Sequence, residues 1–84
     1  MFTLAIIKSG NRVSTYIGTP EHLATQHNGA DVVARVECFD FQHADSVMWG
    51  DAFQHAEAEF RRRDRPIEDV RAELAINLAM RMGR

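Results

Sequence analysis

Side chains that often take part in catalysis or metal binding are scattered along this chain. Cys38 is followed by His43 after four intervening residues and by His55 further on, while His22 and His27 lie upstream. A thiol beside an imidazole can form a nucleophilic thiolate, and a closed zinc site needs four ligands that usually come in closely spaced pairs. The sequence has no CxxC, HxxxH or HExxH pattern. We therefore expect no enzyme activity, no metal and no other cofactor, with a histidine–cysteine metal site as a minor alternative.

The most charged stretch is FRRRDRP at 60–66, and its cationic residues are Arg61, Arg62, Arg63 and Arg65. Such a cluster could bind phosphate. However, two of the arginines follow Glu57 and Glu59 by four residues, which on a helix gives ion pairs in the favourable order. Positive charge is also stabilising near a helix C-terminus. The pattern favours a solvated helix end, and contact with a protein partner or with phosphate remains a less favoured alternative.

Length and charge narrow the classes of function. A chain of 84 residues predicts a single domain over 1–84. Its net charge of −2 argues against a free-standing nucleic-acid binder, which usually has a strong basic excess. The single cysteine cannot form an internal disulfide, and no secretory signal is apparent. The longest apolar run, at 4–7, is too short to cross a bilayer. We expect a cytoplasmic protein.

Two strands joined by a tight turn are predicted at 2–8 and 12–18, because both segments are rich in β-branched and aromatic residues. A two-residue turn at Gly10-Asn11 pairs Leu4 with Ile17 and Ile6 with Thr15. These pairs share one apolar face with Phe2 and Val13. The other face is more polar and consists of Thr3, Ala5, Ser14 and Tyr16. We therefore expect helices to cover only one face of the sheet.

The next segment predicts a short helix at 20–28 and a third strand at 31–39. Thr19 is a good N-cap, Pro20 suits the first helical position, and Gly29 suits a left-handed helix stop. The sequence DVVARVECF fits both a strand and a helical spacing. The strand is preferred because two β-branched residues open the segment and its charges alternate with apolar residues.

Two helices are predicted for the rest of the chain. The first begins near Asp45 or Ser46 and runs to about 64, with Gly50 inside it as a site of close packing or a bend. Its apolar stripe consists of Trp49, Ala52, Phe53, Ala56 and Phe60. Pro66 ends this helix, and the second runs over 66–82.

These elements predict an α+β fold of type ββαβαα. A right-handed crossover through the short helix makes the third strand antiparallel to the first. A sheet order of 2-1-3 then makes every neighbouring pair antiparallel. We expect the two C-terminal helices to cover the apolar face of this sheet.

The last helix is apolar on two sides. The stripe expected to face the core contains Ile67, Val70, Leu74 and Leu78. The opposite side carries Ala72, Ile76, Ala79 and Met80. A chain this small has little material to cover both sides. The second side is therefore either a surface for a partner or for self-association, or is packed under a neighbouring helix.

The absence of a reactive constellation and the two-sided helix favour a non-enzymatic protein-binding module that acts as an inhibitor, adaptor or regulator of a larger complex, with a homodimer as one form. Small anti-defence proteins of mobile elements, such as CRISPR inhibitors, have this general character. The expected contact residues are Ala72, Ile76, Ala79, Met80, Arg61, Arg62, Arg63 and Arg65. The alternative is a nucleic-acid-binding regulator that uses the arginine run together with Lys8 and Arg12.

Overall fold

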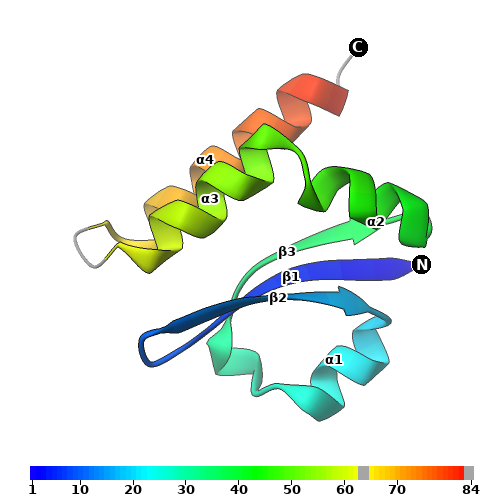
Figure 1. Cartoon of the computed structure of the whole chain (residues 1–84), viewed down its shortest axis with the longest axis horizontal. Helices are drawn as coiled ribbons and strands as arrows, with labels where there is room; N and C mark the ends of the chain where they lie inside the picture. Colours follow the sequence, from blue (N-terminus) through cyan, green and yellow to red (C-terminus); the bar gives the residue numbers. More distant parts are fainter. Residues whose placement is uncertain (63–64, 83–84) are drawn as a thin grey trace.

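A three-stranded antiparallel sheet lies between a short helix on one face and three helices on the other (Figure 1). The computed structural model describes residues 1–62 and 65–82. The strands are β1 (Phe2–Ser9), β2 (Arg12–Gly18) and β3 (Val32–Cys38), in the order β2-β1-β3. The helices are α1 (Pro20–Gln26), α2 (Phe41–Met48), α3 (Asp51–Arg61) and α4 (Ile67–Met82). The predicted α+β class, sheet order and antiparallel pairing are confirmed.

The β1–β2 hairpin has the predicted register. Leu4 pairs with Ile17 and Ile6 with Thr15. The two-residue loop requires a left-handed residue, and Gly10 supplies it with a φ of 61°. Because the side-chain period of a strand is two, this loop fixes which residues of both strands face the α3–α4 side.

Both faces of the sheet are covered, so the prediction of helices on one face was wrong. Leu4 and Ile6 pack with Phe53 and Phe60 in the main core under α2, α3 and α4. On the opposite face, a smaller cluster consists of Ala5, Ile7 and Leu23, with Tyr16 and Val32 packed against it. A single buried leucine on α1 thus covers the face that looks more polar in the sequence.

The helix α1 ends earlier than predicted. Thr19 caps its start, and the Thr19 side chain accepts a hydrogen bond from the backbone N–H of His22, as expected. The helix stops at Gln26, and its C-cap His27 has extended backbone angles. Gly29 is not a left-handed stop: it opens a 3₁₀ turn, Gly29–Asp31, that is capped by the Asn28 side chain. The side chain of Asn28 therefore caps the 3₁₀ turn that leads from α1 into β3.

The helix predicted from about 45 to 64 is two helices. α2 begins at Phe41, where the Asp40 side chain accepts a hydrogen bond from the backbone N–H of His43 at 2.8 Å. Gly50 has extended angles (φ −71°, ψ 155°) and forms the N-cap of α3, so it separates the helices rather than bending one. Trp49, expected in the core stripe, is 69% exposed because the break redirects it. Phe53, Ala56 and Phe60 are buried as predicted.

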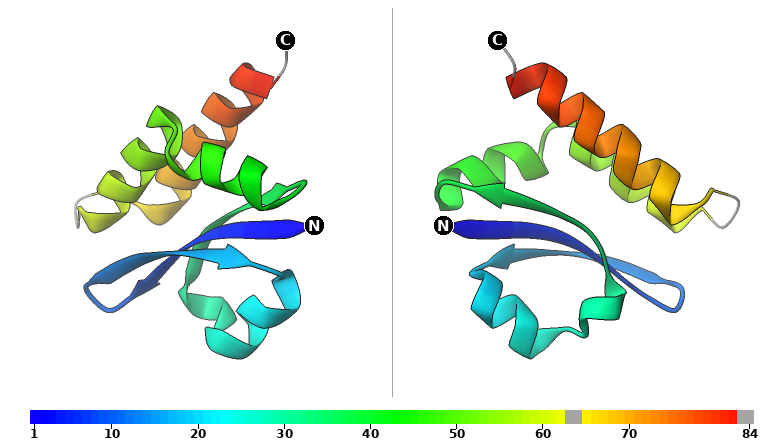
Figure 2. Two further views of the ribbon diagram at one scale, coloured as in Figure 1. Left: turned by 45° about the vertical axis from the view of Figure 1, so that its right-hand side comes forward. Right: turned by 180° about the vertical axis from the view of Figure 1, so that it is seen from behind.

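α3 and α4 pack antiparallel across the main core, with α3 over β2 and α4 over β3 (Figure 2). α3 has 11 residues and α4 has 16. At about 1.5 Å per residue, α4 is longer than its neighbour by roughly 7–8 Å. Its last turns therefore extend beyond the start of α3, near the α2–α3 connection (Figures 1 and 2).

Candidate protein-binding surface

The second apolar side of α4, which the sequence predicted, faces outward. Val70 and Leu74 on its inner side are buried in the core. Ile76 and Met80 are 59% and 70% exposed on the opposite side. Ala72 and Ala79 are exposed on the same side, and we name Ala72, Ile76, Ala79 and Met80 the α4 ridge. Within the described residues, no neighbouring helix covers Ile76, so the alternative of internal packing is wrong.

The α4 ridge has the composition of a contact surface. Its two alanines flank Ile76 on one side, and Glu73 and Met80 flank it on the other. Met80 is unbranched and adapts its shape to a partner. The first turn of α4 carries Glu68 and Asp69, which complement the helix dipole and give the ridge an acidic border. An apolar strip with a polar rim is the usual anatomy of an interface.

Three exposed aromatic side chains around α2 were missed as surface residues by sequence reasoning. Phe39 is 77% exposed and stacks on His43, with ring centroids 5.2 Å apart. Phe41 is 56% exposed and meets the edge of Phe2. Trp49 is the C-cap of α2. Recognising Asp40 as a helix cap would have ended the strand before Phe39 and begun the helix at Phe41, so a signal for both positions was present. The signal for Trp49 was masked by its helical spacing from Ala52 and Phe53.

The arginine run lies at the α3–α4 connection, and its described residues bind carboxylates. Arg61 donates to Glu57 at 2.8 Å, which confirms the predicted i,i+4 ion pair. The second predicted pair involves Arg63, which lies outside the described residues. Lys8 and Arg12 lie at the β1–β2 turn, at the same end of the molecule as the α3–α4 connection (Figure 1).

Glu59 ties the end of α3 to the start of α4. Its side chain is 11% exposed and accepts hydrogen bonds from Arg65 at 3.3 Å and Arg62 at 3.5 Å. Arg65 also donates to Glu73 of α4, and this hydrogen bond is the main cause that raises the pKa of its guanidinium. Arg65 therefore links Glu59 of α3 to Glu73 of α4, whereas the Arg62–Glu59 ion pair lies within the end of α3.

Cys38 is buried in the core. Its side chain is in the main cluster beneath the helices, and its thiol lies 3.8 Å from the Val36 carbonyl oxygen. Burial raises the pKa of this thiol, and the negative charges of Glu37 and Asp40 raise it further. A raised pKa keeps the thiol protonated at neutral pH, which is the opposite of what a nucleophilic cysteine needs.

Two of the four histidines share a neighbouring side chain, and the other two lie apart from them and from each other. His43 accepts a hydrogen bond from the Phe39 backbone, and His55 is 3.8 Å from Glu59. His22 and His27 both contact the ring of Tyr16, although they lie on different sides of α1. In the part of the chain that the structure describes, no group of three or more histidine, cysteine or acidic side chains is arranged to hold a metal ion.

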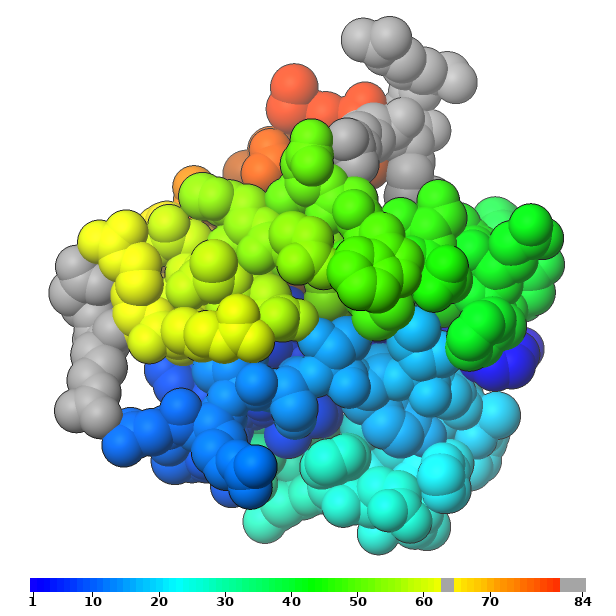
Figure 3. Space-filling view, in the orientation of Figure 1, coloured from blue at the N-terminus to red at the C-terminus, as the bar shows by residue number. Residues whose placement is uncertain are grey.

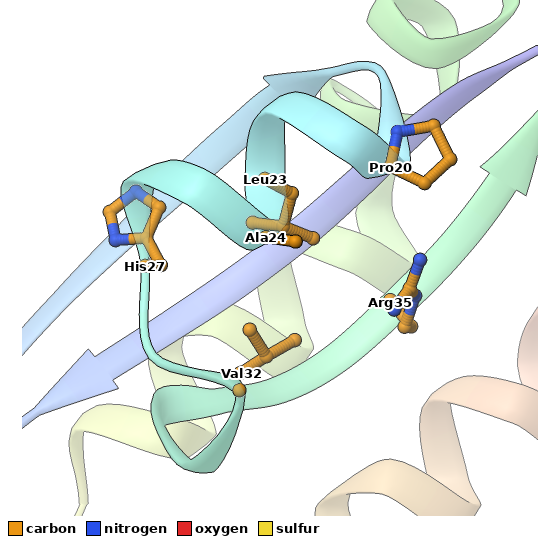
Figure 4. Close-up of a pocket in the computed structure, with 7 residues that line it drawn as sticks. Pro20, Leu23, Ala24, His27, Val32 and Arg35 are labelled. Atoms are coloured by element: carbon orange, nitrogen blue, oxygen red, sulfur yellow. The ribbon is translucent and has the colours of Figure 1, made fainter.

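A pocket lies between α1 and β3 (Figure 4). Leu23 and Val32 face each other across it, and Arg35 lies at its β3 side. Its volume of about 270 Å³ is slightly below the range of small-molecule sites, which begins at about 300 Å³. Every buried polar side-chain atom in the described residues has a hydrogen-bond partner.

A longer groove separates α4 from the edge strand β3. Its β3 wall consists of Ala34, Arg35 and Val36, and its α4 wall consists of Arg71, Ala72, Leu74, Ala75 and Leu78. The groove adjoins the α4 ridge, because Ala72 belongs to both. Figure 3 shows the side of the molecule away from this groove, where α1, β2, α2 and α3 form most of the surface and α4 is visible along the upper rim. Figure 2, from behind, shows the groove side, with α4 above β3.

The comparison with known proteins finds no family model, no curated protein and no solved structure similar to this chain. Among the described residues, no helix has both the length and the apolar character needed to span a membrane.

Proposed function

We propose that this chain is a non-enzymatic protein-binding module that acts as an inhibitor, adaptor or regulator of a larger complex through the α4 ridge. The observation that carries the proposal is the exposure of Ile76 and Met80 on a helix whose other side is fully used by the core. Covering the exposed part of each side chain would recover a part of the roughly 1.5–3 kcal/mol that full burial contributes. A protein partner that covers the ridge recovers this free energy.

The two-sided helix is what makes the ridge suitable for binding. Its inner stripe anchors α4 to the core through Val70 and Leu74. The outer stripe is therefore presented on a rigid element, which keeps the entropy cost of binding low. An amphipathic partner helix or a shallow apolar groove would fit this surface, as in other helix-mediated recognition. The proposal also assigns the protein to a reducing compartment, because its cysteine is buried and unpaired.

The proposal is tested by affinity capture from lysate of the native host, followed by mass spectrometry, with wild type and with the variants Ile76→Asp and Met80→Asp. A charge at the centre of the ridge would be buried without a partner group in the complex. We expect each variant to lose at least about 90% of the captured protein, corresponding to roughly 1.4 kcal/mol or more of binding free energy.

The matched control is Asn77→Asp, which adds the same charge next to Ile76 but on a different side of α4. Asn77 is exposed, so all three variants should keep the wild-type circular dichroism spectrum. Equal capture by Ile76→Asp and wild type would show that the ridge is not the binding surface, and equal loss with Asn77→Asp would attribute the effect to charge alone.

A further inference from the structure

The outer edge of β3 is available for pairing with another strand. In the order β2-β1-β3, β3 pairs with β1 on one side, and the groove beside α4 lies on the other. An edge strand presents unpaired backbone N–H and C=O groups that can extend the sheet. The β1–β3 register shifts between Ile6 and Ile7, which makes Val33 an extra residue near the start of β3. The regular segment of the edge therefore runs over residues 34–38.

The charges on this segment are complementary to themselves. Arg35 and Glu37 point to the same face of the sheet, 3.2 Å apart, and their side chains are 49% and 47% exposed. If two copies of β3 pair antiparallel about Val36, Arg35 of each copy lies opposite the partner's Glu37. Antiparallel registers centred on residue 35 or residue 37 instead place like charges opposite each other, which is destabilising. The alternating signs thus select one register of self-pairing.

The other face of β3 offers a second, apolar match. In the same register Val36 lies opposite the partner's Val36, and Ala34 lies opposite the partner's Cys38. The groove between α4 and β3 lies directly over this position and has a volume of about 380 Å³. Its α4 wall contains the small side chains of Ala72 and Ala75 beside the larger ones of Arg71, Leu74 and Leu78.

We propose that two copies of this chain associate through the β3 edge, antiparallel about Val36, to form a continuous six-stranded sheet. The cross-strand ion pairs between Arg35 and the partner's Glu37 fix the register, and the partner's Val36 packs against Val36 beside the groove. The two α4 helices then lie on the same side of the joined sheet. The outward residues Ile76 and Met80 are outside this contact, so the dimer presents two copies of the surface proposed above for another protein.

The test is native mass spectrometry and sedimentation of wild type, Arg35→Glu, Glu37→Arg and a mixture of the two variants. Each variant places two like-charged pairs across the two-fold axis, so we expect its dimer to be weakened roughly tenfold or more. In the mixture, every pair is again of opposite sign. The two variants should therefore form a heterodimer with close to wild-type affinity, recognised by its intermediate mass.

The control is Arg12→Glu, which changes an exposed arginine at the hairpin end of the other edge strand, β2, and should leave the dimer unchanged. Circular dichroism of each variant checks the fold, since Glu37 also accepts a hydrogen bond from Thr3. A wild-type chain that stays monomeric at all concentrations, or variants that fail to recover on mixing, would overturn this proposal. Ile76→Asp should still dimerise, so failure here and failure of the α4 ridge are separable.

Discussion

At the scale of single residues, Cys38 shows how position decides chemistry. A cysteine near a histidine in the sequence suggests a nucleophile, but its side chain lies in the core and is 1% exposed. Its pKa is raised by burial first and by Glu37 and Asp40 second. The residue therefore acts as a small apolar side chain with a weak donor.

The raised pKa predicts an alkaline loss of stability that depends on Cys38. The unfolded thiol ionises at its ordinary pKa, while the folded thiol remains protonated to higher pH. Above about pH 9 the unfolded state therefore holds fewer protons, so the free energy of unfolding falls as the pH rises toward the folded pKa. Urea unfolding at pH 8 and pH 10 should show a smaller decline for Cys38→Ala than for wild type. An identical decline in both proteins would contradict this account of the thiol.

At the scale of elements, caps decide where the helices begin. The sequence predicted that this helix begins near Asp45 or Ser46. The structure uses Asp40, so that the helix starts at Phe41 and ends before Gly50. The chain can then turn at Gly50 and direct Phe53, Ala56 and Phe60 of α3 into the core.

Capping by Asp40 predicts unequal effects of two similar substitutions. Asp40→Ala removes the acceptor for the His43 backbone N–H and should lower the free energy of unfolding by about 1 kcal/mol. In a domain of this size that corresponds to a decrease in Tm of about 4–8 °C. Asp45→Ala, which lies inside the helix, should cost less than about 0.5 kcal/mol. Equal destabilisation by thermal or urea unfolding would show that Asp40 is not the effective cap.

The predictable elements are those whose limits are set by local chemistry. The Gly10-Asn11 turn fixes the hairpin register, and Thr19 with Pro20 fixes the start of α1. The break at Gly50 was not predictable in the same way, because the helical spacing of Trp49, Ala52 and Phe53 continues across it. Glycine within a helical pattern permits both a close contact and an end, and only the packing of α3 on the sheet selects between them.

At the scale of the whole molecule, the small size of the chain explains its exposed apolar surface. The main core is formed by one face of the sheet and by the inner sides of α2, α3 and α4. α1 covers the second face with little more than Leu23. The exposure of Ile76 and Met80 was predictable, because a helix with two apolar sides exceeds what a chain this short can bury. The self-complementary β3 edge was not predictable from the sequence, because its significance depends on β3 having an open side next to α4.

The central claim, that another protein covers the α4 ridge, is tested most directly by photocrosslinking in the native host. Benzoylphenylalanine is introduced in place of Ile76 and, as a control, in place of Ala58, which is exposed on α3. We predict a discrete covalent adduct with another protein chain from position 76, and none or far less from position 58. Adducts that are absent from both positions, or equally abundant from both, would contradict the claim.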